Sequence, residues 1–479
     1  MTEAVSNLLR GDALEPSLAA IPGSFRDPKG FVARRSDGQI IRVVTEAGQP
    51  SFRAAEASGV YAHLIEHGKL IAHQEVMVEP EPNNPSQQIL LAHPNLPMIS
   101  YPYEWCFGQL KAAALLQLDI LLDSLHFEHT LSDATAFNLQ FQNSKPIFID
   151  TLSFIPYRDG MLWAGQEQFC QQFLFPLLIM AYGNLPFHEH YRGSMTGLDA
   201  SWVNATAPLR RKLSLRYFQF VQLPHWAARR IARRPSKPPQ KVSGRLPKEG
   251  FVYILKQLRN WISSLSYKEQ KSVWSDYVQT RTYEQESLSQ KRHFVAKCIA
   301  QVRPQQLLDI GCNTGEFSFL ALESGAAHVV GLESDHQALA QAYAAAVQKK
   351  ARFLPLYQNL LNPSPAQGWD LSERESLKAR ASPDFVLALA VLHHIVISGN
   401  VPVNRAVANI VNTAKTGIIE WIPKTDPMVT RLLTNREDIF VDYNEDAFQA
   451  ALHQNGALVQ QTERLANGRV LYGFIRRSR

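Results

Sequence analysis

The chain has 479 residues, which is enough for two or three domains, and its 45% hydrophobic and 19% charged residues are typical of a globular protein with buried cores. Its four cysteines are widely separated and show neither metal-ligand spacing nor a disulfide framework, so we expect a cytoplasmic protein without a metal site. The longest apolar run, residues 173–180, is too short to cross a bilayer and contains Pro176, so we expect no transmembrane segment.

The first part of the chain predicts a leader over residues 1–22 and an α+β domain over residues 23–192. The turn signal Ser36-Asp-Gly38 joins two short strands, and apolar residues recur at helical spacing further along the chain. The predicted elements are two strands within 25–44 and helical segments at 54–67, at about 103–125 and within 165–191.

A loop and hairpin in this domain have the spacing of a kinase catalytic segment. The passage resembles aminoglycoside-phosphotransferase-like kinases, in which Asp133 would orient the substrate hydroxyl while Asn138 and Asp150 would bind metal. No glycine-rich loop precedes it, Arg42 is the nearest candidate for the strand lysine, and Thr-Leu follows Asp150 in place of Phe-Gly. A plain loop and hairpin, or a kinase-like domain without phosphoryl transfer, are the alternatives.

A basic segment separates this domain from the rest of the chain. Lysine and arginine are concentrated between Arg210 and Lys248, and residues 229–242 have the composition of a linker. Such a segment can bind RNA, DNA or anionic lipid, although a solvated linker is the commoner explanation. We therefore predict a basic linker region over residues 193–249 and do not expect nucleic-acid binding.

Residues 307–318 have the pattern of a strand, a tight turn and a helix N-terminus. The apolar strand passes through Asp309 and breaks into a loop with Gly311 and Gly315. Glycine lets the backbone turn sharply and approach a ligand, and the helix N-terminus offers free N–H groups. The next predicted strand ends on Glu333, whose carboxylate can accept both hydroxyls of a ribose. This combination indicates a nucleotide-like ligand at the edge of an open α/β sheet.

The glycine loop fits the nicotinamide fingerprint poorly. It resembles motif I of the class I S-adenosylmethionine (SAM)-dependent methyltransferases, with Asn313 in place of the middle glycine. Asparagine tolerates a left-handed backbone better than most residues, so the replacement is mild. The resemblance implies SAM as the cofactor. The loop and strand-end residues that would hold it are Asp309, Gly311, Cys312, Asn313, Gly315 and Glu333.

Residues 250–479 complete the pattern of a Rossmann-like, seven-stranded methyltransferase sheet with a helical prelude. The helix at 251–265 is interpreted as a lead-in to this domain, and Tyr277 and Tyr283 are either cofactor contacts or core aromatics. A closing hairpin turned at Asn467-Gly468 distinguishes such a sheet from a plain dinucleotide-binding fold. The other predicted elements are helices at about 287–302, 337–348 and 440–453, and strands at 353–360, from 385, and at 417–422, 458–465 and 469–475.

Four further residues complete the predicted site. Asn359 occupies the place where methyltransferases carry a residue that contacts adenine, and Ala390 follows the fourth strand beside the cofactor. His393 and His394 lie near the same edge, and an imidazole can take a proton from a hydroxyl or amine near neutral pH. The alternative is that one of these histidines caps the next helix or fills the core.

The resemblance covers about residues 274–479 and predicts a SAM-dependent methyltransferase, with a small molecule or a glycan favoured as the unidentified acceptor. The whole chain, including residues 100–106 and 149–154, also resembles a group of bacterial methyltransferases described as nodulation-protein-like. Two alternatives stay open: a bifunctional kinase–methyltransferase, and a SAM-binding protein without turnover. The sequence identifies neither the methyl acceptor nor the oligomeric state.

Overall fold

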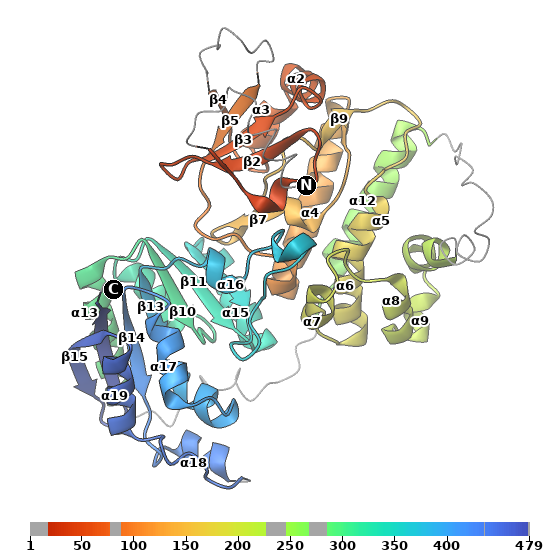
Figure 1. Cartoon of the computed structure of the whole chain (residues 1–479). Helices are drawn as coiled ribbons and strands as arrows, with labels where there is room; N and C mark the ends of the chain where they lie inside the picture. Colours follow the sequence, from red (N-terminus) through yellow and green to blue (C-terminus); the bar gives the residue numbers. More distant parts are fainter. Residues whose placement is uncertain (1–17, 77–87, 227–245, 268–284, 435, 478–479) are drawn as a thin grey trace.

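The computed structural model of the protein describes residues 18–76, 88–226, 246–267, 285–434 and 436–477. Two sheets organise the chain, a five-stranded antiparallel sheet near the N-terminus and a seven-stranded sheet near the C-terminus (Figure 1). Within the described residues, no helix combines the length and the apolar character needed to cross a membrane.

The first sheet is built around the predicted hairpin. In sheet order its strands are β1 (Ala19–Ala20), β2 (Gly30–Arg34), β3 (Ile40–Val44), β5 (Ile89–His93) and β4 (Gln74–Val76). β2 and β3 pair in antiparallel register across a turn in which Gly38 has φ +89°. Because Ala19 and Ala20 pair with β2, the sheet begins within the segment that was predicted to be a leader.

The helix predicted at 54–67 is in fact two helices. α2 (Gln49–Ser58) begins earlier than predicted, with Pro50 in its first turn, where the missing N–H leaves no hydrogen bond unmade. Gly59 ends α2 in the left-handed conformation, with φ +82°, and α3 (Val60–Glu66) starts directly after it.

A long helix forms the centre of the first domain. α4 (Phe107–His126) buries Leu110, Ala114 and Leu118 on one face, as predicted. β6 (His129–Leu131) pairs with β9 (Phe154–Pro156), and the predicted hairpin consists of β7 (Leu139–Gln142) and β8 (Lys145–Phe148). The helices that follow are α5 (Gln166–Phe169), η4 (Cys170–Leu174), α6 (Phe175–Leu178), η5 (Ile179–Gly183) and α7 (His188–Arg192).

Much of the segment predicted to be a linker is helical, so that prediction is wrong for residues 200–222. The helices there are α8 (Ala200–Thr206), α9 (Leu209–Lys212), α10 (Leu215–Tyr217) and the π-helix η6 (Phe218–Gln222). α8 packs against both η5 and η6 because Val203, Phe220 and Val221 are buried. Residues 227–245 lie outside the described residues.

The predicted lead-in helix packs on the first domain instead. α12 (Lys248–Ser264) contacts α4, and the guanidinium of Arg259 is ion-paired with Asp119. The indole Nε1 of Trp261 donates to the hydroxyl of Tyr182 at 3.0 Å. The boundary that sequence patterns place at residue 250 therefore falls inside this packing.

The second sheet confirms the predicted seven-stranded methyltransferase sheet. In sheet order its strands are β12 (Phe353–Tyr357), β11 (His328–Glu333), β10 (Gln306–Ile310), β13 (Phe385–Ala388), β14 (Thr416–Trp421), β16 (Val470–Arg476) and β15 (Ala457–Arg464). The strands β12, β11, β10, β13 and β14 are parallel to one another, whereas β16 runs antiparallel between β14 and β15. All four residues of β13 are buried, as expected for a strand covered on both faces.

Helices connect these strands. α19 starts later than predicted because Asn444 caps it, its Oδ1 accepting the N–H of Ala447 at 2.9 Å. α17 was not predicted. The helices of this domain are α13 (Gln285–Val302), α14 (Glu316–Glu323), α15 (His336–Lys349), α16 (Leu377–Arg380), η8 (His394–Ser398), α17 (Val403–Val411), α18 (Pro427–Leu433) and α19 (Glu445–Gln454).

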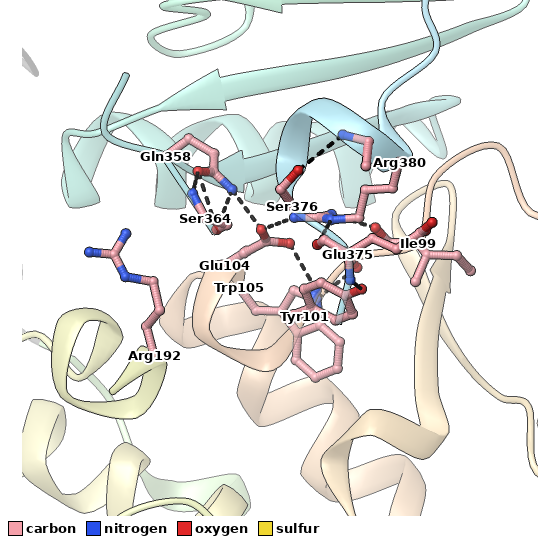
Figure 2. A network of polar contacts seen from close by, with 12 residues as sticks. Ile99, Tyr101, Glu104, Trp105, Arg192, Gln358, Ser364, Glu375, Ser376 and Arg380 are labelled. Atoms are coloured by element: carbon pink, nitrogen blue, oxygen red, sulfur yellow. Dashed lines mark hydrogen bonds and ion pairs between the residues drawn. The ribbon is translucent and has the colours of Figure 1, made fainter. Parts of the chain in front are cut away.

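A buried ion pair joins the two domains. Glu104, at the end of the 3-10 helix η2 (Pro102–Glu104), is ion-paired with Arg380 of α16, and the exposed fractions of the two side chains are 0% and 2% (Figure 2). The same carboxylate oxygen accepts from Nε2 of Gln358 at 2.6 Å, and the other oxygen accepts the N–H of Tyr101 at 2.9 Å. Both oxygens of this buried carboxylate are therefore bound.

Arg380→Ala is expected to lower the free energy of unfolding by about 3–5 kcal/mol, because it leaves the Glu104 carboxylate buried without a cation. Chemical denaturation measures this loss. The matched control is Arg464→Ala, which breaks the exposed ion pair with Glu445 and is expected to cost less than about 1 kcal/mol. Adding Glu104→Gln to Arg380→Ala removes the unpaired charge and should restore part of the loss. Equal, small effects of Arg380→Ala and Arg464→Ala would contradict this account.

Candidate functional site

The loop between β10 and α14 has the backbone that its residue types predict. Gly311 and Gly315 have φ +74° and +89°, and Asn313 has φ +50°. A Cβ at Gly315 would lie 2.8 Å from Cε1 of Phe353, so this position needs glycine for space as well as for backbone conformation. The Oδ1 of Asn313 accepts the N–H of Thr314 at 2.8 Å, which stabilises the left-handed turn.

Glu333 is held rigidly at the carboxyl end of β11. One oxygen accepts the N–H of Asn313 at 2.8 Å, and the other accepts those of Ser334 and Asp335 at 2.7 and 2.8 Å. Burial raises the pKa of Glu333, and these three amides oppose that rise. A carboxylate has about four lone-pair sites, so one further donor can be accepted in a fixed direction.

Asp309 lies on β10, the strand that precedes the glycine loop, and is buried. Its Oδ2 accepts from the hydroxyl of Ser318, in the first turn of α14, at 2.6 Å. Burial raises the pKa of Asp309 to about 6, while the Ser318 hydrogen bond acts in the opposite direction. The strand and the helix are thus joined by a carboxyl group that is costly to ionise.

One cavity of about 390 Å³ collects most of the predicted site. Gly315 is not on its wall and acts on the turn instead. His393 is also absent from the wall, whereas His394 is present. The predicted residues that line the cavity are Asp309, Gly311, Cys312, Asn313, Glu333, Asn359, Ala390 and His394.

Asn359 and Ala390 approach the cavity from the loops after β12 and β13. The Oδ1 of Asn359 accepts the N–H of Leu361 at 3.0 Å, which fixes the first turn of its loop. Ala390 has φ +52°, a left-handed conformation that costs free energy in a residue with a Cβ. Such a conformation persists only where surrounding contacts enforce it, and such positions cluster at ligand sites.

The two adjacent histidines differ in position and share an environment that keeps them neutral. His393 is 2% exposed, and neither of its ring nitrogens has a hydrogen-bond partner among the residues that the structure describes. Burial lowers the pKa of His393 well below its usual range, and burial and Arg469 lower that of His394 to about 4. His394 can therefore accept a hydrogen bond in the cavity but holds a proton weakly near neutral pH.

Among the cavity residues that sequence patterns did not predict, two are instructive. Lys291 of α13 lines the cavity, and its ammonium lies 2.6 Å from the carboxylate of Glu420, which is fully buried on β14. A signal was available, because Lys291 falls on the apolar stripe of its helix between Ser287 and Phe294. Gln358 lines the cavity and also bonds Glu104, a contact between distant parts of the chain that local patterns do not encode.

The kinase-like residues of the first domain are also brought together. Nδ2 of Asn138 lies 3.1 Å from Asp133 Oδ2 and 3.3 Å from Asp150 Oδ2, and Arg42 is ion-paired with Asp150 at 3.0 Å. Ser153 donates to Asp133 at 2.7 Å, and burial together with the charge of Asp150 raises the pKa of Asp133 to about 6. The carboxylates of Asp133 and Asp150 therefore both have partners within the protein.

Two sequence predictions remain to be placed. Tyr277 and Tyr283 lie outside the described residues. Within the described part of the chain, no group of three or more histidine, cysteine, aspartate or glutamate side chains is arranged to hold a metal ion.

Comparison with known proteins gives the family. No family model matches the chain. The chain is 42% identical over 472 residues to the nodulation protein NoeA of Rhizobium meliloti (strain 1021), and the alignment covers 97% of this chain and 98% of NoeA. The chain belongs to the NoeA family. The resemblance to nodulation-protein-like proteins is confirmed, and it extends over both domains of this NoeA-family chain.

Two similar solved structures each cover less than half of this NoeA-family chain. Magnesium protoporphyrin IX methyltransferase ChlM from Synechocystis PCC 6803, solved with bound SAH, is 16% identical, with 46% of this chain and 95% of ChlM covered and a TM-score of 0.29. The N-methyltransferase NodS from Bradyrhizobium japonicum WM9 is 13% identical, with 41% and 99% covered and a TM-score of 0.30. We assign the Rossmann-like fold of the second domain from the order and direction of the strands in its seven-stranded sheet.

Asp309→Asn is expected to stabilise the NoeA-family protein near neutral pH. The wild-type pKa rises from 3.8 to about 6 on folding, so ionised Asp309 destabilises the folded state above that pH, by an amount on the order of 3 kcal/mol. The stability of the variant relative to wild type should therefore increase as the pH rises through this interval. Thermal unfolding of both proteins at a series of pH values measures this difference in stability. The control is Asp442→Asn, at an exposed aspartate. If Asp309→Asn and Asp442→Asn show the same change of stability with pH, burial does not raise the pKa of Asp309.

Proposed function

We propose that this NoeA-family protein is a class I SAM-dependent methyltransferase whose acceptor is a hydroxyl or amine group of a small molecule or glycan. The observation that carries the proposal is the cavity at the carboxyl ends of β10, β11 and β13, where Glu333, Asp309 and the left-handed loop at Gly311 meet. Ligands of open α/β sheets bind at this edge. The name of the NoeA relative, a nodulation protein, is compatible with many acceptors and selects none.

The residues of the cavity fit the parts of SAM. Glu333 has capacity left for a ribose hydroxyl, and its three amide partners keep it from rotating away. Asn359 lines the cavity, and we assign it the contact with adenine. The loop at Gly311 also lines the cavity, and its lack of a Cβ allows close approach of a ligand to the backbone. When bound, SAM supplies a methyl group that its sulfonium has already activated.

The protein's own contribution is to align the acceptor and exclude water. Leu389, Val391 and Ile395 line the cavity next to His394 and make this part of the wall apolar. His394 is neutral and accepts a hydrogen bond from the acceptor's O–H or N–H, which orients a lone pair toward the methyl group. Because the pKa of His394 is about 4, we assign it an orienting role and not the storage of a proton.

SAM is expected to bind the wild-type protein in a calorimetric titration. Glu333→Ala is expected to weaken binding by about 10- to 150-fold, because a hydrogen bond to a charged group contributes about 1.5–3 kcal/mol. Glu323→Ala, at an exposed glutamate on α14, is the matched control and should bind SAM normally. Unchanged affinity in a folded Glu333→Ala variant would refute the ribose assignment. Absence of SAM binding by the wild type would refute the proposal.

The same titration with ATP and magnesium addresses the kinase alternative. No binding heat is expected, since Arg42, Asn138 and Ser153 already pair the carboxylates of Asp133 and Asp150. Heat from ATP and magnesium would favour the bifunctional alternative instead.

His394→Ala is expected to reduce methyl transfer by about 100-fold while leaving SAM affinity unchanged, since the imidazole contacts the acceptor and not the cofactor. Transfer is measured as label moved from methyl-labelled SAM to material in a bacterial extract. His393→Ala, one residue away and off the cavity wall, is the comparison and should lose less transfer when folded. Equal losses would refute the assignment to His394. SAM binding without transfer in any extract would favour a binding protein without turnover.

A further inference from the structure

The helices between Ala200 and Trp226 expose apolar side chains that a folded protein normally buries. Leu209, Leu213 and Leu215 are 79%, 88% and 79% exposed. Leu223, Trp226 and Trp202 are also exposed. We call Leu209, Leu213, Leu215, Phe218, Leu223 and Trp226 the apolar patch. Single exposed leucines are common on protein surfaces, but a cluster of this kind marks an interaction site.

The helical run from α10 to Trp226 is apolar on both faces. Tyr217, Phe220 and Val221 are buried against the domain. The opposite face exposes Leu215, Phe218 and Trp226 to solvent. The rings of Phe218 and Trp226 pack edge to face. A helix on a protein surface usually turns polar residues outward, so the outward face has an apolar partner that the core does not provide.

α9 belongs to the same surface. Nε2 of Gln222 donates to the backbone oxygen of Lys212 at 3.3 Å, which ties η6 to the end of α9. Lys212 also donates to the backbone oxygen of Asn204, which ties α9 to α8. Leu209 and Leu213, four residues apart, therefore extend the exposed surface that begins at Leu215.

Basic side chains surround these leucines. Arg210, Arg211 and Arg216 are exposed, and within the part of the chain that the structure describes they form no ion pair with a carboxylate. Arg211 lies over the ring of Tyr182 at 4.9 Å, which holds it at the surface. No aspartate or glutamate occurs between residues 200 and 248, so nothing in this stretch of sequence neutralises the positive charge.

We propose that this surface docks the protein on an anionic lipid membrane. The leucines and Trp226 enter the boundary between headgroups and acyl chains, and Arg210, Arg211 and Arg216 bind lipid phosphates. Interfacial membrane-binding helices combine these two residue classes. RNA would use the arginines but leave the leucines without a partner, since leucine has no ring on which a base can stack. A second copy of the chain would bring two positive surfaces together.

The position of the surface suits docking during catalysis. α8 and α9 lie on the side of the first domain that is away from the seven-stranded sheet (Figure 1). The cavity is lined by no residue between Ala200 and Trp226, so docking and ligand binding use different residues. The proposal does not depend on methyl transfer and concerns where the protein works.

Vesicle flotation with the full-length protein tests the proposal. Wild type is expected to float with mixed phosphatidylcholine–phosphatidylglycerol vesicles, to float much less with phosphatidylcholine alone, and to be released by salt. The variant Leu209→Ser/Leu213→Ser/Leu215→Ser should lose flotation. The variant Arg210→Gln/Arg211→Gln/Arg216→Gln should bind at least about tenfold more weakly, since each basic residue near the surface contributes a severalfold factor.

The matched control is Leu371→Ser/Val441→Ser, which removes exposed apolar side chains at 69% and 84% exposure from other surfaces and should float like wild type. Circular dichroism establishes that each variant is folded. The proposal is overturned if wild type does not bind anionic vesicles, or if the leucine and arginine variants float as well as the control. It is also overturned if the leucine variant dissociates a dimer of the wild type, which would identify a second copy as the partner. Wild-type protein that binds single-stranded RNA but not vesicles would identify nucleic acid instead.

Discussion

The buried carboxylate of Glu104 is the contact on which the arrangement of the two domains depends. Arg380 neutralises it from the second domain, and Gln358 donates to it from the loop that follows β12. Gln358 also lines the cavity, so one residue belongs both to the domain contact and to the candidate cofactor site. Any rotation of the first domain would leave a buried charge unpaired, and this cost makes the shape of the cavity a property of the whole chain.

The parts of the site that sequence predicts are those whose requirement is local. Gly311, Asn313 and Gly315 are the residue types that tolerate positive φ, so the sharp turn can be inferred from the letters alone. Glu333 ends an apolar run, and the end of a parallel strand is the edge at which ligands bind. Apolar runs and turn signals likewise predicted the strands and the closing hairpin, and the resemblance to methyltransferases implied their seven-stranded sheet.

The parts that sequence does not predict depend on partners far away in the chain. Composition made residues 200–222 resemble a linker, and only the packing of Val203 and Phe220 on the first domain turns them into helices. His393 and His394 are equivalent as letters, but successive residues in a helical turn point about 100° apart, so one enters the cavity wall and the other the core. Lys291 lines the cavity because Glu420, on another element, can pair with it.

The strand β12 is an edge of the second sheet, and the first domain contacts it. Pro355 sits at the centre of this edge strand and has no N–H to offer, and Gln109 of the first domain donates to its carbonyl oxygen at 3.1 Å. A foreign strand therefore finds neither a donor nor a free acceptor at that residue, which protects the edge against templated aggregation. Part of this protection comes from the first domain of the same chain, so the second domain without the first would expose that carbonyl oxygen at its sheet edge.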